Sequence, residues 1–595
     1  MSNDATRIPI INRQLEEIRD AILKGHVNGA DAATLDTLFG AMIDGANTTK
    51  LFREWWPLAR AQDVEAANLG VGDPDAGTVA NRYHTLCRWF ELIGKAWAGK
   101  YYTLRGPDYR VNSTGVTTLT PMGDLADKVA AVCATELTAD DFDWADEDPM
   151  TWYLRFNGLS LADGTMNVLS VEGVDDGFDI SGNTGPVYTG RLALWRRWYS
   201  DGAYEYKTFA TQPEGGFVPW AADVAPTTNA HRPMSWQATF DGSLYGQKLT
   251  SGSGFDGLSW QRNGNTTAIN KSAADGLTAA RKWNSYEGTL SDTDVDVILD
   301  LWQLRHFDLE NSRILEGCTT YNLDYTVSAA ETDVTSVVLT TAQGANILIG
   351  CFLDVGSTAR GGQRARGNVL SKETVTIDGT DYCRVYLDVP AVFSTSEGDH
   401  VATLPWTPGS TEHLPGHKDG SIYSCTDGKT PARIAGVELL SGGYAVGLDP
   451  LLVSDWDSGR TPKSIYTVYA CRDSQNQASA VTNYESVGTF TGPNSGWQYI
   501  KHLQIRTDGM LVPEGCGTTG TGDSKFMKSA FYFSDSSGVR ALWRFANLRN
   551  EGNAGLAGAN GNNTPSNANW NERPRLSARK GGLSGPPAAK APLGV

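Results

Sequence analysis

The spacing of apolar residues near the start of the chain predicts an amphipathic helix over residues 7–24. The apolar positions step alternately by three and four residues, and they are Ile8, Ile11, Leu15, Ile18 and Ile22. This is the a/d stripe of a coiled coil, and β-branched isoleucine at both kinds of position favours trimers. The stripe is short, so it fits either the oligomerisation seam of a homotrimer or a contact within its own domain.

Residues 1–148 are predicted to form a partly helical N-terminal region that contains this stripe. The region ends in an acidic run from Asp140 to Asp148, directly before Pro149. This run lacks the mid-loop glycine and the closing glutamate of a calcium-binding hand, so we interpret it as a domain boundary. No pattern in the chain indicates a metal site or a cofactor.

From residue 149 the pattern changes to short runs of β-branched and aromatic residues, which predict an antiparallel β domain over 149–328. Such runs include Met166–Val171 and Tyr204–Thr208, in which apolar and polar residues largely alternate. Turns rich in Gly, Asp and Pro separate the runs, as is typical of antiparallel strands joined by short connections.

Within this domain, one clear helix is predicted over residues 291–310. Ser291 is a suitable N-cap, and Asp292 and Asp294 place negative charge at the positive end of the helix. The apolar face of the helix consists of Val295, Ile298, Leu299 and Trp302. We expect this face to be buried.

Residues 329–405 are predicted to form a small inserted β module. Val334–Leu339 is a candidate strand, and Thr374–Ile377 and Tyr382–Val389 flank the dipeptide Asp378-Gly379. An Asp-Gly pair between two strand-like runs is a strong signal for a tight β-hairpin.

A glycine-rich stretch inside the module carries three arginines, Arg360, Arg364 and Arg366. We expect this stretch to form a flexible loop between strands. A basic loop on an acidic protein has two interpretations, which are a contact with a charged partner and a solvated surface loop.

The last predicted domain spans residues 406–580, and its closing segment, residues 538–577, has an unusual composition. Asparagine makes up nine of the 25 residues from Asn547 to Asn571. Asparagine tolerates left-handed backbone and caps turns with its side chain, so the segment is expected to be rich in turns. Packing residues frame the segment, and loops on a packed frame are where binding residues tend to lie. Residues 581–595 are predicted to be a disordered tail.

The closing segment contains short motifs in a fixed order. They are Trp543-Arg544, Asn553-Ala554-Gly555, Asn562-Asn563, Ser566-Asn567-Ala568-Asn569 and Arg573-Pro574. This series resembles the variable region of diversity-generating retroelement target proteins from phages, prophages and bacteria. In those regions a Gly-Gly pair usually follows Trp-Arg, whereas this chain has Phe545-Ala546. Both a diversified copy and a fixed relative fit this departure.

The resemblance implies a C-type lectin-like domain, of the fold shared with formylglycine-generating enzymes, that displays a diversified binding surface on a rigid scaffold. Carried over residue by residue, the exposed ligand-binding positions are Phe545, Leu548, Arg549, Asn550, Ala557, Ala559, Asn560, Asn562, Asn563 and Trp570. The scaffold positions are Trp543, Arg544, Gly555 and Arg573. Phe545, Leu548 and Arg549 are expected to act as anchors, because aromatic and arginine residues carry most interface energy.

Composition adds limits to this picture. The 595-residue chain is predicted to be multidomain α+β and mostly β, since its 65 glycines suit a loop-rich β architecture. A net charge of −18 argues against nucleic acid or an anionic membrane as partner. No apolar run is long enough for a transmembrane helix, and no N-terminal signal pattern occurs, so synthesis in the host cytoplasm is expected. Eight dispersed cysteines without a Cys-x-x-Cys motif are typical of buried thiols.

These features together predict a phage virion receptor-binding (tropism) protein that attaches to a host bacterial surface receptor, either protein or glycan. The N-terminal region is expected to contact other virion proteins and to form a homotrimer. The alternative is a structural virion protein of the baseplate, tail or head decoration, whose lectin-like domain makes virion contacts. Enzymatic activity is not expected, because no His-Glu-x-x-His or Gly-x-Ser-x-Gly motif occurs. Residues 543–575 also contain no cysteine, whereas the resemblance to formylglycine-generating enzymes would require a reactive one there. A carbohydrate-active enzyme with a carboxylate pair is the third interpretation.

Overall fold

The structure, a computed structural model, describes residues 80–96, 99–108, 118–128, 130, 153–226, 228–255, 265–309, 316–413, 428–517 and 529–578. These residues form a mostly β protein in which most paired strands run antiparallel, as predicted. The predicted stripe of Ile8, Ile11, Leu15, Ile18 and Ile22 and the predicted tail at 581–595 lie outside the described residues. Within the described part of the chain, no helix is long and apolar enough to cross a membrane.

A nine-stranded sheet is built by the C-terminal part of the chain. Its order is β24 (Glu485–Gly492), β23 (Ser464–Ala470), β22 (Tyr444–Trp456), β28 (Gly538–Arg544), β29 (Ala559–Asn560), β27 (Ala530–Phe533), β25 (Gly496–Leu503) and β26 (Pro513–Gly517), with β30 (Glu572–Pro574) beside β22. In β23 buried and partly exposed residues alternate along the whole strand, as a half-buried strand requires. The pairs β22–β30 and β27–β29 are parallel, and the other pairs are antiparallel.

Smaller sheets form the rest of the body. The four-stranded sheet has the order β4 (Met166–Val171), β3 (Tyr153–Ser160), β5 (Val187–Leu192) and β9 (Met234–Ala238). The five-stranded sheet has the order β2 (Thr120–Gly123), β1 (Tyr101–Pro107), β7 (Tyr204–Ala210), β6 (Trp195–Ser200) and β8 (Val218–Pro219). Beside them lie the three-stranded sheet β11 (Lys248–Ser251), β10 (Gly242–Tyr245) and β12 (Asn265–Thr267), and the pair β20 (Ala432–Ile434) and β21 (Val437–Leu439). The predicted strands at Met166–Val171 and Tyr204–Thr208 are thereby confirmed as β4 and most of β7.

Helices pack against several of these sheets. Helix α4 (Ala80–Ala96) packs against the four-stranded sheet. Helix α5 (Ala273–Ala280) packs on β11 and β22. A capping box starts α5, because the Ser272 hydroxyl accepts from the amide of Asp275 while the Asp275 carboxylate accepts from the amide of Ser272.

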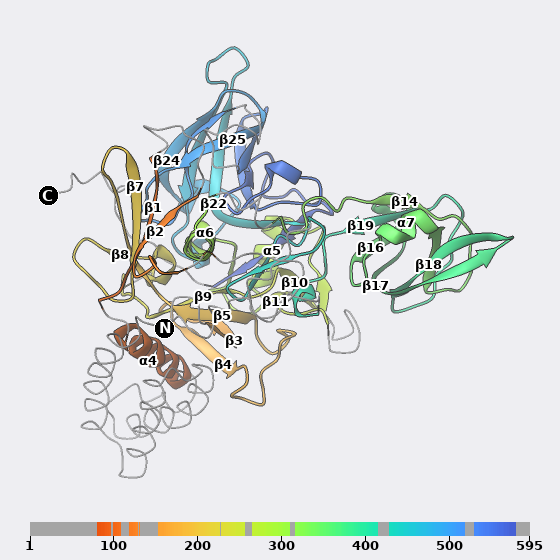
Figure 1. Cartoon of the computed structure of the whole chain (residues 1–595), viewed down its shortest axis with the longest axis horizontal. Coiled ribbons are helices and arrows are strands. Elements are labelled where there is room, and N and C mark those ends of the chain that lie inside the picture. Colours follow the sequence, from red (N-terminus) through yellow and green to blue (C-terminus); the bar gives the residue numbers. More distant parts are fainter. Residues whose placement is uncertain are drawn as a thin grey trace, which may run out of the picture.

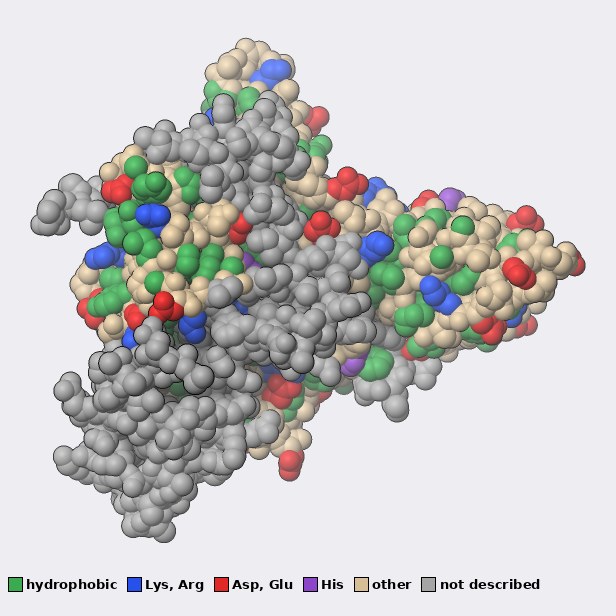
Figure 2. All heavy atoms as spheres, viewed as in Figure 1, with side chains coloured by type: hydrophobic (Ala, Val, Ile, Leu, Met, Phe, Trp, Pro, Cys, Tyr) green, Lys and Arg blue, Asp and Glu red, His purple; other side chains and the backbone are tan. Residues whose placement is uncertain are grey.

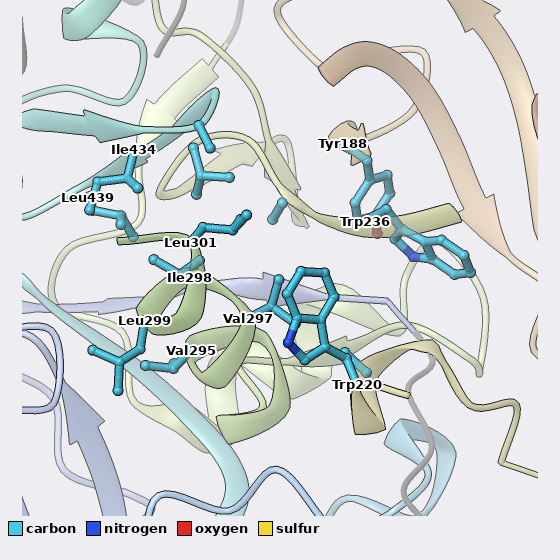
Figure 3. Packing of buried hydrophobic residues seen from close by; sticks show 14 of the residues in the cluster. Tyr188, Trp220, Trp236, Val295, Val297, Ile298, Leu299, Leu301, Ile434 and Leu439 are labelled. Atoms are coloured by element: carbon cyan, nitrogen blue, oxygen red, sulfur yellow. The ribbon is translucent and has the colours of Figure 1, made fainter. Parts of the chain in front are cut away.

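Helix α6 (Asp292–His306) lies at the centre of the body, and it confirms the predicted helix and its N-cap. The Ser291 hydroxyl accepts a hydrogen bond from the amide of Thr293, and Phe307 ends the helix in a left-handed conformation with φ 50°. The predicted apolar face is buried, but so is every other residue of α6. Figure 3 shows Ile434 and Leu439 on one side of the helix and Trp220 and Trp236 on the other.

Residues 324–404 form the six-stranded module, which extends from one side of the body (Figure 1). Its strand order is β14 (Asp324–Thr326), β19 (His400–Leu404), β16 (Phe352–Thr358), β17 (Gly361–Ile377), β18 (Thr380–Asp388) and β15 (Ser336–Thr340), with the short helix α7 (Thr341–Asn346) beside β15 and β18. The hairpin predicted at Asp378-Gly379 is confirmed, since both residues have positive φ, 49° and 79°, between β17 and β18. The predicted arginine loop is wrong in part, because Arg364 and Arg366 belong to strand β17.

One core is shared across the predicted boundaries between residues 1–148, 149–328 and 406–580, while a further core cluster lies wholly within residues 406–580. Strand β1 pairs with β7, and strand β13 (Gly288–Thr289) pairs with β31 (Leu576–Ser577) at the end of the closing segment. One cluster of buried apolar residues contains side chains from α4, from α6 and from the segment after β28. Periodicity reports only which face of an element is apolar, so it does not reveal that distant stretches share one core.

Candidate ligand-binding surface

The closing segment, residues 538–577, is woven into the body rather than displayed as a loop. Strand β28 pairs with β22, and the chain then passes through the short helix η5 (Glu551–Asn553) to β29, β30 and β31. The amide of Phe545 donates to the carbonyl of Gly558, and that of Leu548 to the carbonyl of Gly442. These backbone hydrogen bonds fix both ends of residues 545–548 to the neighbouring segments.

Six of the ten predicted ligand-binding residues are buried, so their predicted exposure is wrong. They are Phe545, Leu548, Asn550, Ala557, Ala559 and Asn560. Phe545 packs into the central core and Leu548 into the core of the six-stranded module. The two asparagines form turns, since Asn550 Oδ1 accepts from the amide of Asn547 and Asn560 Oδ1 from that of Asn562 (2.9 Å).

The other four predicted ligand-binding residues reach solvent. Arg549 is exposed, and Asn562, Asn563 and Trp570 are half-buried. The predicted anchors therefore reduce to Arg549, because Phe545 and Leu548 have no free surface. An asparagine-rich segment can thus bury its apolar and small residues while leaving a few polar side chains outside.

The four predicted scaffold residues are all buried. Trp543 lies 5.4 Å from the Tyr444 ring, and Gly555 is enclosed after η5. The Arg544 guanidinium donates to both carboxylate oxygens of Asp292 at the start of α6, at 2.7 and 2.6 Å. A bidentate pair of this kind fixes the closing segment to the central helix.

Arg573 and Arg575 share a second buried carboxylate. Arg575 Nη1 lies 2.5 Å and Arg573 Nη1 3.4 Å from the oxygens of Asp241. Arg573 Nη2 also donates to the carbonyl of Trp406 at 2.8 Å, and Arg575 Nη2 to that of Ala238 at 2.6 Å. Arg575 follows directly after the Arg573-Pro574 motif, and the sequence does not predict it as a scaffold residue. Its structural role is evident only from its contact with Asp241.

Arg549 and Trp570 meet two residues of the six-stranded module and its entry, Arg360 and Asn322. We name these four residues the arginine–tryptophan cluster. The guanidinium carbon of Arg360 lies 4.2 Å from the centre of the Trp570 ring, and that of Arg549 lies 5.0 Å from it. Both arginines donate to Asn322 Oδ1, from Arg360 Nη2 at 2.7 Å and from Arg549 Nε at 3.0 Å.

The cluster is held from behind by the module. Arg360 sits in the turn between β16 and β17 with φ 58°, and its Nε donates to the carbonyl of Thr403 at 2.9 Å. Trp570 packs against a small group of buried apolar residues, Ile269, Phe352 and Leu404. The indole and the Arg360 side chain are therefore fixed in place, while Arg549 reaches outward.

The cluster carries two positive charges, those of Arg360 and Arg549. Among the described residues, neither Arg360 nor Arg549 forms an ion pair. By contrast, Arg364 and Arg366, which both lie on strand β17, form ion pairs with Asp399 and Asp354, respectively. Burial and the nearby positive charge of Arg549 together lower the pKa of Arg360 to about 10, against the opposing effect of Asp324 and Asp354. On the face shown in Figure 2, acidic and basic side chains are interspersed.

A cavity of about 110 Å³ between the five-stranded sheet, α6 and β25 is another candidate. Its charged side chains are already engaged. Lys207 lies 2.5 Å from Asp300, Asp296 lies 2.5 Å from Arg196, and His502 lies 2.6 Å from Glu205. In the described part of the chain, no group of three or more His, Cys, Asp or Glu side chains is placed to hold a metal ion. The arginine–tryptophan cluster is therefore the stronger candidate.

The chain was also compared with known proteins. No protein-family model matches it, and no curated protein matches it.

Proposed function

We propose that this chain is a phage virion receptor-binding protein whose closing segment attaches the particle to the host cell surface. One observation carries the proposal. The predicted ligand-binding residues that reach solvent include Arg549 and Trp570, and these two meet in one cluster in which neither arginine forms an ion pair among the described residues. Arginine and tryptophan are the residues that most often dominate binding energy at interfaces.

The rigid setting of the cluster supports this function. The closing segment is held by buried ion pairs to α6 and to Asp241, and Trp570 is held by the module. Side chains on a preformed support bind without the entropy cost of ordering a loop. A C-type lectin-like fold for residues 406–580, a virion location and a trimeric N-terminal region belong to the same proposal and follow from the resemblance of the closing segment.

The proposal is tested by measuring how the purified chain binds to host cells. Changing Arg549, Asn562 and Asn563 together to alanine removes one exposed and two half-buried side chains, and none of the three is a residue of the buried core. Changing Arg460 and Asn494 to alanine makes a control on turns elsewhere in the nine-stranded sheet. We expect the first variant to lose binding and the control to retain it, with both folded.

Unchanged binding by the first variant would contradict the proposal. The same domain would then be assigned to contacts with other virion proteins, which is the structural alternative. Pull-down of assembled particles with the first variant tests this alternative, because a closing segment that contacts virion proteins would lose particle binding when its side chains are removed.

A further inference from the structure

Three arginines lie close together in the module, and only one of them lacks an acidic partner among the described residues. Arg364 Nε lies 2.5 Å from Asp399 Oδ2, and Arg366 bonds Asp354. Arg360 instead bonds only uncharged oxygens, those of Asn322, Leu323 and Thr403. Among the described residues, Arg364 and Arg366 are therefore each paired with a carboxylate of the module, whereas Arg360 is not.

The acidic groups nearest to Arg360 are engaged elsewhere. Asp324 and Asp354 both act on the charge of Arg360 through space. Asp324 Oδ1 lies 2.9 Å from His400 Nδ1, and Asp354 accepts a hydrogen bond from Arg366. Two guanidinium groups thus converge on one neutral amide oxygen, although like charges repel at this separation.

Donors are available for a ligand at this point. Within the described residues, Arg549 uses only its Nε, and Arg360 uses Nε and Nη2. The free donors are both Nη groups of Arg549 and Nη1 of Arg360. A guanidinium presents its donors in a planar fork that matches a carboxylate or a phosphate.

The surroundings of the cluster are rich in amide groups. Asn322 and Asn569 are exposed, and Asn571, which follows Trp570, is half-buried. Amides donate and accept hydrogen bonds, so they suit a ligand with many hydroxyl groups. The half-buried indole of Trp570 adds an apolar wall beside them.

We propose, on the basis of the receptor-binding function above, that the arginine–tryptophan cluster binds an anionic polysaccharide of the bacterial surface. A carboxylate or phosphate group of the polysaccharide bonds Arg549 and Arg360, and its sugar rings lie against Trp570 and the neighbouring asparagines. The net charge of −18 provides no long-range attraction for such a ligand. Recognition therefore depends on short contacts at the cluster.

The test uses the full chain and three immobilised polymers. They are polygalacturonate, which carries carboxylates, a glycerol-phosphate teichoic acid, which carries phosphates, and dextran, which is neutral. We expect binding to one anionic polymer at least about tenfold tighter than to dextran, as charged hydrogen bonds provide. The polymer that binds identifies the anionic group.

Asn322→Asp is the decisive variant. It places a carboxylate of nearly the same shape between the two arginines. This internal carboxylate then competes for the two guanidinium groups with the anionic group of the ligand. We expect it to weaken binding to the anionic polymer at least about tenfold while the chain stays folded. Asn494→Asp adds the same charge on the exposed turn between β24 and β25, and Arg364→Gln removes an arginine already paired with Asp399. Both controls are expected to bind normally.

Equal binding to dextran, or unchanged binding by Asn322→Asp, would overturn this ligand class. If cells bind the chain through Arg549 but neither anionic polymer competes, the receptor-binding function stands and the polysaccharide inference fails. Loss of cell binding after protease treatment of the cells leads to the same conclusion, because it identifies a protein receptor. If the polymers bind while cells do not, the cluster binds anions and the receptor-binding function fails.

Discussion

Arg544 shows how a single side chain of the closing segment serves the fold. Its guanidinium forms a bidentate pair with Asp292, and both side chains are almost fully buried. Removing one partner of a buried pair leaves an uncompensated charge in a medium that solvates it poorly. The Trp-Arg motif is therefore a structural joint between β28 and the start of α6.

We predict that Arg544→Met lowers the free energy of unfolding by about 3–5 kcal/mol. Adding Asp292→Asn to this variant is expected to recover part of the loss, because the stranded charge disappears. Denaturant titration at pH 7 measures both. Arg540→Met is a matched control on the same strand, since Arg540 bonds only the uncharged oxygens of Ser536, Ser537 and Val539, and a comparable loss there would contradict the ion-pair explanation.

Asp449 is a buried carboxyl group that depends on pH. Burial raises its pKa from the ordinary 3.8 to about 7, against hydrogen bonds from Ser291 and the amide of Cys471. The folded state therefore holds a proton that the unfolded state releases from about pH 4 upwards. Stability is highest below the unfolded pKa and is lost as the pH rises through the folded pKa, after which it stays constant.

Asp449→Asn is expected to remove this loss. The variant should gain thermal stability relative to the natural chain at pH 8.5, and the difference should shrink or reverse at pH 4. Melting curves at the two pH values measure it. A stability difference that does not change between them would contradict the assigned protonation of Asp449.

At the scale of elements, the six-stranded module has a core of its own but is joined to the body through Leu548 and Trp570. Its β17–β18 hairpin depends on left-handed backbone at Asp378 and Gly379. A side chain at Gly379 meets no neighbouring atom, so any cost of a substitution there comes from backbone conformation alone.

We predict that Gly379→Ala destabilises the hairpin by about 1–2 kcal/mol. Hydrogen exchange should become faster in β17 and β18 while the nine-stranded sheet is unaffected. Gly177→Ala is the matched control, because its added Cβ also meets open space but its φ is not positive. Faster exchange throughout the body would show that the module is not an independent unit.

At the scale of the whole molecule, distant stretches of chain share one large core, and the cluster joins the closing segment to the six-stranded module through Trp570, Arg549 and Arg360. A single cluster of this size offers few contacts. We expect modest affinity at one site, with multivalency of the predicted trimer supplying tight attachment to cells.

Ile11→Asp together with Ile18→Asp tests this expectation, because charges in the seam of a coiled coil prevent assembly. Sedimentation should show a monomer in place of a trimer. Cell binding should weaken by at least about a hundredfold while binding to a soluble ligand stays the same. A monomeric natural chain, or a variant that binds cells as well as the natural chain, would contradict the trimer prediction.

Local pattern alone determined several elements of this protein. The cap at Ser291, the hairpin at Asp378-Gly379 and the strands at Met166–Val171 and Tyr204–Thr208 follow from residues within a few positions of each other. These signals are local because capping, turn geometry and strand alternation act between near neighbours along the chain.

Only the tertiary structure decided which residues of the closing segment reach solvent. Phe545 and Leu548 look like surface anchors in sequence, yet they complete two different cores. Arg360 lies far from Arg549 in sequence, and nothing local distinguishes it from Arg364 and Arg366 until their carboxylate partners are seen. Burial and ion pairing depend on long-range contacts, and these leave no periodic trace in the sequence.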